Sequence, residues 1–445
     1  MDILRSRMLL FFGLAPLMAV ADSPPTHEFT LDNGLKVVVR EDHRAPLVNS
    51  QLWFKVGSAD EAPGRSGLSH ALEHMVYKGS SKVCAGEAMS ILGTLGAAYN
   101  AFTGEDFTVH HQTLEPRYLS VAFELMADLM STAHLRAEDW VPEIATIREE
   151  RREGEDQPEM LARERFLSLA HLSSGYRTPT IGWMHDLHRL DVADLRDWYQ
   201  TRYAPGNAVL VVVGDVTLEQ VKSSAQRYFG VLEARPFTAP RTPLELDRPG
   251  ERRLMLTVPS THSELLMAFN VPALLTAESP RTVHALRLLQ VLLAGSNSAR
   301  LQAQLQFKAP LFSSVFSEYI WLGRGDSLLL IDANLTNAYT GSLDDAEARV
   351  WQELEKLRLH PPAPDELERA RTQLIAQNIY SQDSIEGQAH YLGALVSSGL
   401  PWRLMDEEIA ELKAVTPEDI QQTAATYLTR DRMSIAHVHG GQTDE

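Results

Sequence analysis

Three side chains that could bind and use a metal ion stand close together near residue 70. The stretch SHALEHMVYKGS, residues 69–80, contains His70, Glu73 and His74. On a helix the two histidines lie one turn apart, and Glu73 lies beside them, opposite a stripe of apolar side chains. Neutral imidazole suits zinc, and a nearby carboxylate can take a proton from zinc-activated water. The order His-x-x-Glu-His predicts a hydrolytic zinc site; the alternative is a solvated polar helix face.

A hydrolytic zinc site needs a third protein ligand, and an acidic stretch farther along the chain offers candidates. In VPEIATIREERREGEDQPE, Glu143 and Glu150 are two helical turns apart and therefore share one face. The neighbouring carboxylates of Glu149 and Glu153 point away from that face. We expect Glu150 to be the third ligand. Glu143 would lie behind it as an orienting group or proton acceptor.

The composition indicates an ordinary globular protein with more than one domain. The chain has 445 residues, of which 44% are hydrophobic and 22% charged. This length is too great for one core and predicts two domains of roughly 200 residues. The net charge of −18 argues against a nucleic-acid partner. A solvated acidic surface accounts for this charge, and an acidic interior that attracts basic peptides is the alternative.

The first 21 residues are typical of a secretory signal peptide. Two arginines precede an apolar run that is too short to span a bilayer comfortably, and Ala-Val-Ala at 19–21 forms a small-residue cleavage site. An uncleaved anchor is the alternative interpretation. No later run is long and apolar enough for a membrane span, and the only cysteine, Cys84, cannot form an internal disulfide. We therefore expect a secreted, periplasmic protein.

Strand and helix patterns segregate along the chain, which predicts an α+β fold with antiparallel sheets. Strand patterns with turn signals occupy much of the first part, helical patterns dominate from about 115 to 203, and NAVLVVVGDV at 207–216 is a strand buried on both faces. A proline-rich and charged stretch then interrupts the pattern. We expect a metal-binding domain at 22–235, a linker at 236–252 and a second domain at 253–445.

The second domain repeats the first in outline but without the metal ligands. The tripeptide His-Ala-Leu that begins at His70 recurs at His284, after a similar order of strands. Arg287 and a leucine then stand where the first copy has Glu73 and His74. We interpret this as a duplicated domain whose second copy has no metal site; accidental similarity of two amphipathic helices is the alternative.

These motifs together resemble the pitrilysin/insulinase and mitochondrial processing peptidase group of zinc metallopeptidases, over residues 27–440. In that group the third ligand follows His-x-x-Glu-His by about 75 residues, which Glu150 matches. NAFT at 100–103 resembles the edge strand on which substrate lies extended. The resemblance thus implies Asn100, Ala101 and Phe102 as substrate-binding positions; a plain strand and turn is the alternative.

The resemblance also implies a function and an assembly. Two homologous α+β domains form half of a clamshell, and two such halves enclose a chamber that admits unstructured peptides. The resemblance therefore implies a zinc-dependent endopeptidase with Glu73 as general base. A non-catalytic subunit of the same fold that binds peptides or supports assembly is the alternative.

One segment departs from the family pattern. Active members carry a helix reading like SRLxxxLREKxGLAYS, whose arginine and tyrosine hold the substrate carbonyl. This chain has SARLQAQLQFKAPLFSS at 298–314, with Gln306 in place of the arginine and Ser313 in place of the tyrosine. The resemblance therefore implies a heterodimer with a homologous subunit that supplies the pair, while a homodimer is the alternative.

Overall fold

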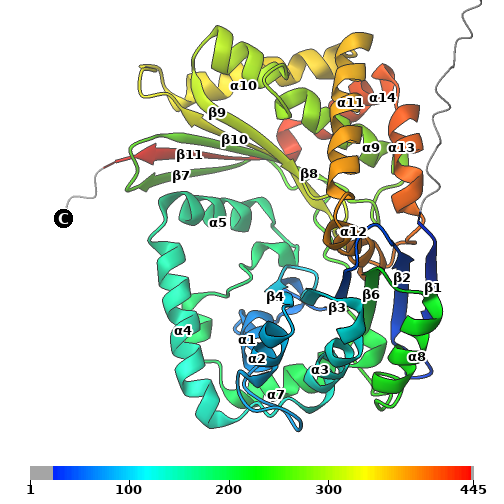
Figure 1. Ribbon diagram of the computed structural model, residues 1–445. Helices are drawn as coiled ribbons and strands as arrows, with labels where there is room; N and C mark the ends of the chain where they lie inside the picture. The colour runs from blue at the N-terminus through cyan, green and yellow to red at the C-terminus, as the bar shows by residue number, and fades with distance from the viewer. Residues whose placement is uncertain (1–23, 442–445) are drawn as a thin grey trace, which may run out of the picture.

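The computed structural model describes residues 24–441, which fold into two β-sheets surrounded by helices (Figure 1). The expected signal peptide at 1–21 lies outside the described residues. None of the helices within 24–441 combines the length and apolar character needed to cross a membrane.

The first sheet has six strands in the order β1-β2-β6-β3-β5-β4, so that β4 lies at an edge. All neighbours are antiparallel except β2 and β6, which run parallel. The strands are β1 (Thr26–Thr30), β2 (Lys36–Glu41), β3 (Val48–Phe54), β4 (Ala98–Thr103), β5 (Thr108–Leu114) and β6 (Ala208–Gly214).

The second sheet repeats this connectivity with five strands in the order β7-β11-β8-β10-β9. Its one parallel pair, β7 and β11, corresponds to β2 and β6, and its edge strand β9 corresponds to β4. The α+β fold of two homologous units is therefore confirmed, with one parallel pair in each otherwise antiparallel sheet. The strands are β7 (Arg252–Val258), β8 (Glu264–Val271), β9 (Phe312–Tyr319), β10 (Ser327–Leu335) and β11 (Met433–Gly440).

Helices of the first half lie mainly below the first sheet in Figure 1, and those of the second half lie mainly around the second sheet. The first set is α1 (Leu68–Met75), α2 (Glu87–Thr94), α3 (Leu119–Thr132), α4 (Ala137–Glu155), α5 (Pro158–Ala170), α6 (Met184–Leu187), α7 (Val192–Arg202) and α8 (Leu218–Tyr228). The second set is α9 (Pro280–Ala294), α10 (Leu343–Leu359), α11 (Pro364–Ser381), α12 (Ile385–Ser397), α13 (Leu404–Ala414) and α14 (Pro417–Tyr427).

Short helical segments connect these elements. They are η1 (Ser58–Asp60), η2 (Pro116–Tyr118), η3 (Gly175–Arg177), η4 (Pro205–Asn207), η5 (Gln302–Lys308) and η6 (Arg430–Arg432). Residues 229–251, which include the expected linker, contain no helix or strand.

Each sheet is completed by a helix from the other half. Helix α12 of the second half packs its apolar side chains on β3, β5 and β6, and Gly393 permits this because a Cβ there would lie 2.1 Å from the Trp53 side chain. Helix α5 of the first half packs Phe166 and neighbouring alanines on β8, β10 and β11. The exchange explains why β6 is buried on both faces, as its unbroken apolar sequence predicts.

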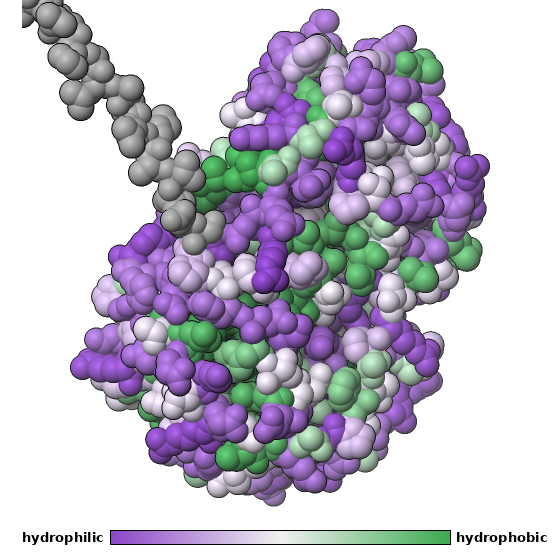
Figure 2. All heavy atoms as spheres, turned by 90° about the vertical axis from the view of Figure 1, so that its right-hand side faces the viewer, coloured by the Kyte–Doolittle hydropathy of each residue, from purple (hydrophilic) through white to green (hydrophobic). Residues whose placement is uncertain are grey.

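The outer surface is mostly hydrophilic, as the charged composition indicates. In Figure 2, apolar residues gather across the middle of the face, where the upper and lower parts meet. The helix exchange buries apolar surface between the two halves, which therefore share parts of their cores.

Candidate metal centre

Helix α1 carries the histidines and begins at a sharply defined turn. Gly67 adopts a left-handed φ of 91°, and a Cβ at this position would lie 2.7 Å from the carbonyl oxygen of Ile181. The carboxylate of Glu61 accepts hydrogen bonds from the backbone N–H groups of Gly67 and Ser69, both at 2.7 Å. These contacts satisfy donors at the start of the helix and fix its direction. Leu72 and other apolar residues of α1 are buried, so the polar face is left for the histidines.

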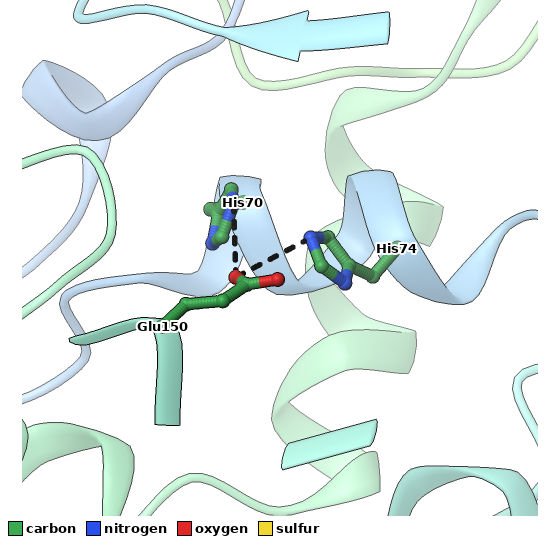
Figure 3. A group of neighbouring side chains, drawn as sticks. All are labelled: His70, His74 and Glu150. Carbon is green, nitrogen blue, oxygen red and sulfur yellow. Dashed lines mark ion pairs between the residues drawn. The ribbon is translucent and has the colours of Figure 1, made fainter. Parts of the chain in front are cut away.

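His70, His74 and Glu150 come together between α1 and α4 (Figure 3). Oε2 of Glu150 lies 3.9 Å from Nε2 of His70 and 3.8 Å from Nε2 of His74. Tetrahedral zinc ligands at ~2.0–2.1 Å from the ion stand about 3.4 Å from one another. The three donor atoms are therefore spaced closely enough to surround one ion after a small inward movement.

The chemistry of this donor set fits zinc. Two imidazole nitrogens and one carboxylate oxygen form the three-ligand set of a hydrolytic zinc ion, with a position left for water. Burial, and then the neighbouring His74, lower the pKa of His70 to about 4, so this ring is a neutral donor at physiological pH. Among residues 24–441, no lysine or arginine lies within 4.0 Å of the Glu150 carboxylate to neutralise it.

Glu143 lies behind His74, where the spacing within α4 predicts it. Its Oε1 atom is 2.9 Å from Nδ1 of His74, and its Oε2 atom is 2.5 Å from Nζ of Lys78. Burial pushes the pKa of Glu143 upward, but the hydrogen bonds from Lys78 and His74 outweigh this and the net pKa is lowered. An ionised carboxylate in this place holds the proton of His74 on Nδ1 and leaves Nε2 as the free donor.

Glu73 lies on the same face of α1 as the two histidines, and its side chain lines a cavity. It lines a cavity of about 470 Å³ together with His74, Tyr99 and Asn100. Its Oε2 atom accepts a hydrogen bond of 2.5 Å from the hydroxyl of Thr103. Burial raises the pKa of Glu73, which makes this carboxylate a better proton acceptor than an exposed one.

The expected substrate-binding positions lie on β4 at the edge of the first sheet. Asn100 and Ala101 line the same cavity as Glu73. The ring of Phe102 lies elsewhere, in a cluster with Trp53 and the ring of His390 from α12. Its position on β4 still leaves its backbone at the edge strand, so only its side chain is separated from the cavity.

The second half has different chemistry at the corresponding helix, α9. Arg287 is buried, forms an ion pair with Glu408 and stacks over the Trp321 ring at 3.9 Å. The two residues that depart from the family pattern are neighbours: Nε2 of Gln306 donates to the carbonyl oxygen of Ser313 at 2.8 Å. Gln306 and Ser313 are therefore in contact on the surface of the second half.

A second group with metal-ligand atoms lies in the same half. Asp344, Glu347 and His437 approach one another, but Arg253 and Arg430 both bind the Glu347 carboxylate. These two cations already neutralise the carboxylate, so this group is an ion-pair cluster.

Two residues that contact the candidate site, Lys78 and Thr103, are not predicted from the sequence. Lys78 lies beyond the end of α1 at Met75, so helical spacing does not place it, and its closeness in sequence to His74 is the one signal that connects it with the site. Thr103 belongs to the NAFT stretch, but nothing local indicates that its hydroxyl reaches Glu73, because that contact depends on how β4 packs against α1.

The chain belongs to the insulinase peptidase family. Residues 36–181 match the family described as Insulinase (Peptidase family M16), and residues 189–374 match the one described as Peptidase M16 inactive domain. The second match covers most of the half that lacks the histidine pair.

Individual proteins are similar to this chain in sequence or in fold. The zinc protease PqqE of Helicobacter pylori is 28% identical over 94% of this chain and 96% of its own. The crystal structure of a protease from Helicobacter pylori has a TM-score of 0.87 and 25% identity, covering 94% of this chain and all of that one. The periplasmic protease PqqL from Escherichia coli has a TM-score of 0.78 and 17% identity over 94% of this chain, but only 48% of that one.

Proposed function

We propose that this chain is the zinc-bearing subunit of an endopeptidase that hydrolyses short or unfolded peptides. The observation that carries the proposal is the convergence of His70, His74 and Glu150, with Glu73 on the adjoining face of the same helix. The family to which the chain belongs and the name of its Helicobacter relative support zinc as the metal.

The residues divide the chemistry between them. His70, His74 and Glu150 would hold zinc, which lowers the pKa of water toward ~7 and polarises a peptide carbonyl. Glu73 takes the proton of the attacking water and passes it to the leaving amine. Thr103 holds one oxygen of Glu73, so the other oxygen is left to face the reacting atoms.

The sheet edge beside the cavity is suited to an extended peptide. The outer side of β4 has no neighbouring strand within the described residues, so its backbone groups can pair with a substrate strand. Asn100, Ala101 and Phe102 would supply this edge, and pairing there would place a peptide bond next to Glu73. An unfolded segment can adopt this conformation, whereas a folded protein cannot.

A homologous partner would complete the enzyme. Gln306 and Ser313 offer neither a cation nor a phenol for the substrate carbonyl, so we propose that a second subunit provides the arginine and tyrosine. The correspondence of this chain to about half of PqqL supports a working unit built from two such pieces.

We also propose export to the periplasm, with cleavage after Ala21. The arginines, apolar run and small residues at the start of the chain support this, as does the periplasmic location stated for PqqL. N-terminal sequencing of the exported protein should begin at Asp22, and a mature protein that begins at Met1 would contradict the proposal.

Cleavage of an unstructured peptide by the chain mixed with a homologous arginine- and tyrosine-bearing subunit tests the proposed function. Glu73→Gln should abolish cleavage and leave the zinc content unchanged, because only the proton acceptor is lost. Glu149→Gln, an exposed change on α4, is the matched control and should cleave normally. A wild-type complex that binds peptide and zinc but never cleaves would instead favour a non-catalytic peptide-binding subunit.

A further inference from the structure

An arginine of the second half is inserted between two acidic residues of the first half. Arg324 lies in the turn between β9 and β10 and is only 4% exposed. Its guanidinium lies 2.8 Å from Oδ2 of Asp60 in η1 and 3.0 Å from Oδ1 of Asp106 in the turn between β4 and β5. The backbone N–H of Arg324 also donates to Asp106 at 2.7 Å. One residue therefore ties two separate loops of the first half to the second sheet.

The two loops are also bonded to each other. The N–H groups of Ser58 and Ala59 donate to the carbonyl oxygens of Gly104 and Glu105, at 3.2 and 2.9 Å. Tyr176 closes the cluster, because its hydroxyl donates to Asp106 at 2.7 Å and accepts from the N–H of Gly325 at 2.9 Å.

Both loops lead directly to the metal centre. The turn that holds Asp106 begins just after Thr103, whose hydroxyl holds Glu73. Segment η1, which holds Asp60, is followed by Glu61, whose carboxylate binds the first N–H groups of α1. Of the two partners of Arg324, Asp60 is the residue before Glu61, which fixes the start of α1. Asp106 follows Thr103, which holds the Glu73 carboxylate, by three residues.

We infer that Arg324 is a positioning residue through which the second half holds Glu73 in place. The effect of Arg324 on catalysis rests on the proposed function, whereas its effect on the β4 hairpin does not. Thr103 contacts Glu73 and none of the three zinc ligands, so a change at Arg324 that loosens the β4 hairpin should disturb Glu73 more than zinc binding. Two carboxylates that face one buried arginine depend strongly on its fork of donors, which lysine cannot reproduce.

Hydrogen exchange of the metal-free full chain tests the structural part without any need for activity. In Arg324→Lys, the N–H groups of Ser58, Ala59 and Gly104 should exchange at least about tenfold faster than in the wild type, while those in the middle of α4 stay unchanged. Arg371→Lys is the matched control: Arg371 links α11 to carbonyl oxygens of the second half and should leave the hairpin unchanged. Equal exchange in Arg324→Lys and the wild type would overturn the inference.

Kinetics test the catalytic part. In the active complex, Arg324→Lys should lower kcat by about tenfold to a hundredfold, with KM within about twofold and zinc content unchanged. Thr103→Val should lower kcat similarly, and the double variant should be little worse than either single one, because both act through Glu73. Additive effects, or loss of zinc in Arg324→Lys, would overturn the inference. If the wild-type complex is inactive, the proposed function fails, and hydrogen exchange still decides whether Arg324 holds the hairpin.

Discussion

The Nδ1 atom of His74 lies 2.9 Å from Oε1 of Glu143, while the Nε2 atom of the same ring faces Glu150. One imidazole is thus held between two glutamates that stand two turns apart on α4. This arrangement supports the proposal that Glu143 orients His74 and that Glu150 binds the metal.

Replacement of Glu143 by glutamine should therefore weaken zinc binding without abolishing it. The amide can still contact His74 but carries no charge to fix its tautomer, and loss of such a partner typically costs 10–100-fold in affinity. Competition with a zinc chelator measures this. Glu149→Gln, which changes an exposed carboxylate on the same helix, should bind zinc as the wild type does. An unchanged affinity in Glu143→Gln would assign this residue another role.

Helical spacing predicts that Glu143 and Glu150 share one face of α4, and the need for a third metal ligand predicts that this face lies next to α1. Glu143 and Glu150 are separated by seven residues, and each lies beside His74 in the folded chain. The α+β fold and the repeat also follow from local patterns, because strand alternation and turn residues are visible in the sequence.

The remaining features depend on contacts between distant segments. Nothing in the local sequence of α5 or α12 indicates that each helix covers the sheet of the opposite half, because an apolar helix face fits either sheet. The same holds for Arg324, which lies in an ordinary turn and gains its role only from Asp60 and Asp106, more than 200 residues earlier.

The pair Gln306 and Ser313 predicts that the isolated chain binds zinc but is nearly inactive. Loss of one oxyanion donor typically costs ~10²–10³ in rate, and here both expected donors are missing. Peptide cleavage should appear when a homologous arginine- and tyrosine-bearing subunit is added, together with a stable heterodimer in size-exclusion chromatography. A lone chain that cleaves at full rate, is inhibited by chelator and carries no second subunit would contradict this.

A gain of function tests the same two positions within this chain. The Gln306 side chain already contacts the Ser313 backbone, so Gln306→Arg and Ser313→Tyr would place both donors at one location. The double variant should cleave an unstructured peptide faster than the wild-type chain alone. The single variant Gln306→Arg is the control and should gain less, because one donor remains missing.

A buried carboxylate pair in the second sheet predicts a dependence of stability on pH. Glu264 on β8 and Asp332 on β10 lie near each other. Burial, and then the neighbouring Asp332, raises the pKa of Glu264, and burial raises the pKa of Asp332 although its hydrogen bond with Glu264 opposes this. A raised pKa means that the folded state binds protons that the unfolded state has already released. The contribution of this pair to stability is therefore fully present below the unfolded pKa values, near pH 4, and is lost as pH rises through the folded ones.

Replacement of Glu264 by glutamine should remove much of this fall. Thermal unfolding at about pH 5 and about pH 8 measures it: the variant should lose less stability than the wild type between the two conditions, with a shift of about 2–4 °C for each kcal/mol. Asp344→Asn, an exposed change in the same half, should retain the wild-type dependence. Identical pH profiles for Glu264→Gln and the wild type would show that the pair ionises freely.

The zinc content of the purified full-length chain tests the central claim most directly, because it requires neither substrate nor partner. The wild type and Glu149→Gln should each hold about one zinc ion per chain, while His70→Ala, His74→Ala and Glu150→Gln should each hold almost none, since a three-ligand site has no ligand to spare. A wild-type chain without zinc, or a Glu150→Gln variant that retains as much zinc as the wild type, would contradict the proposed metal centre.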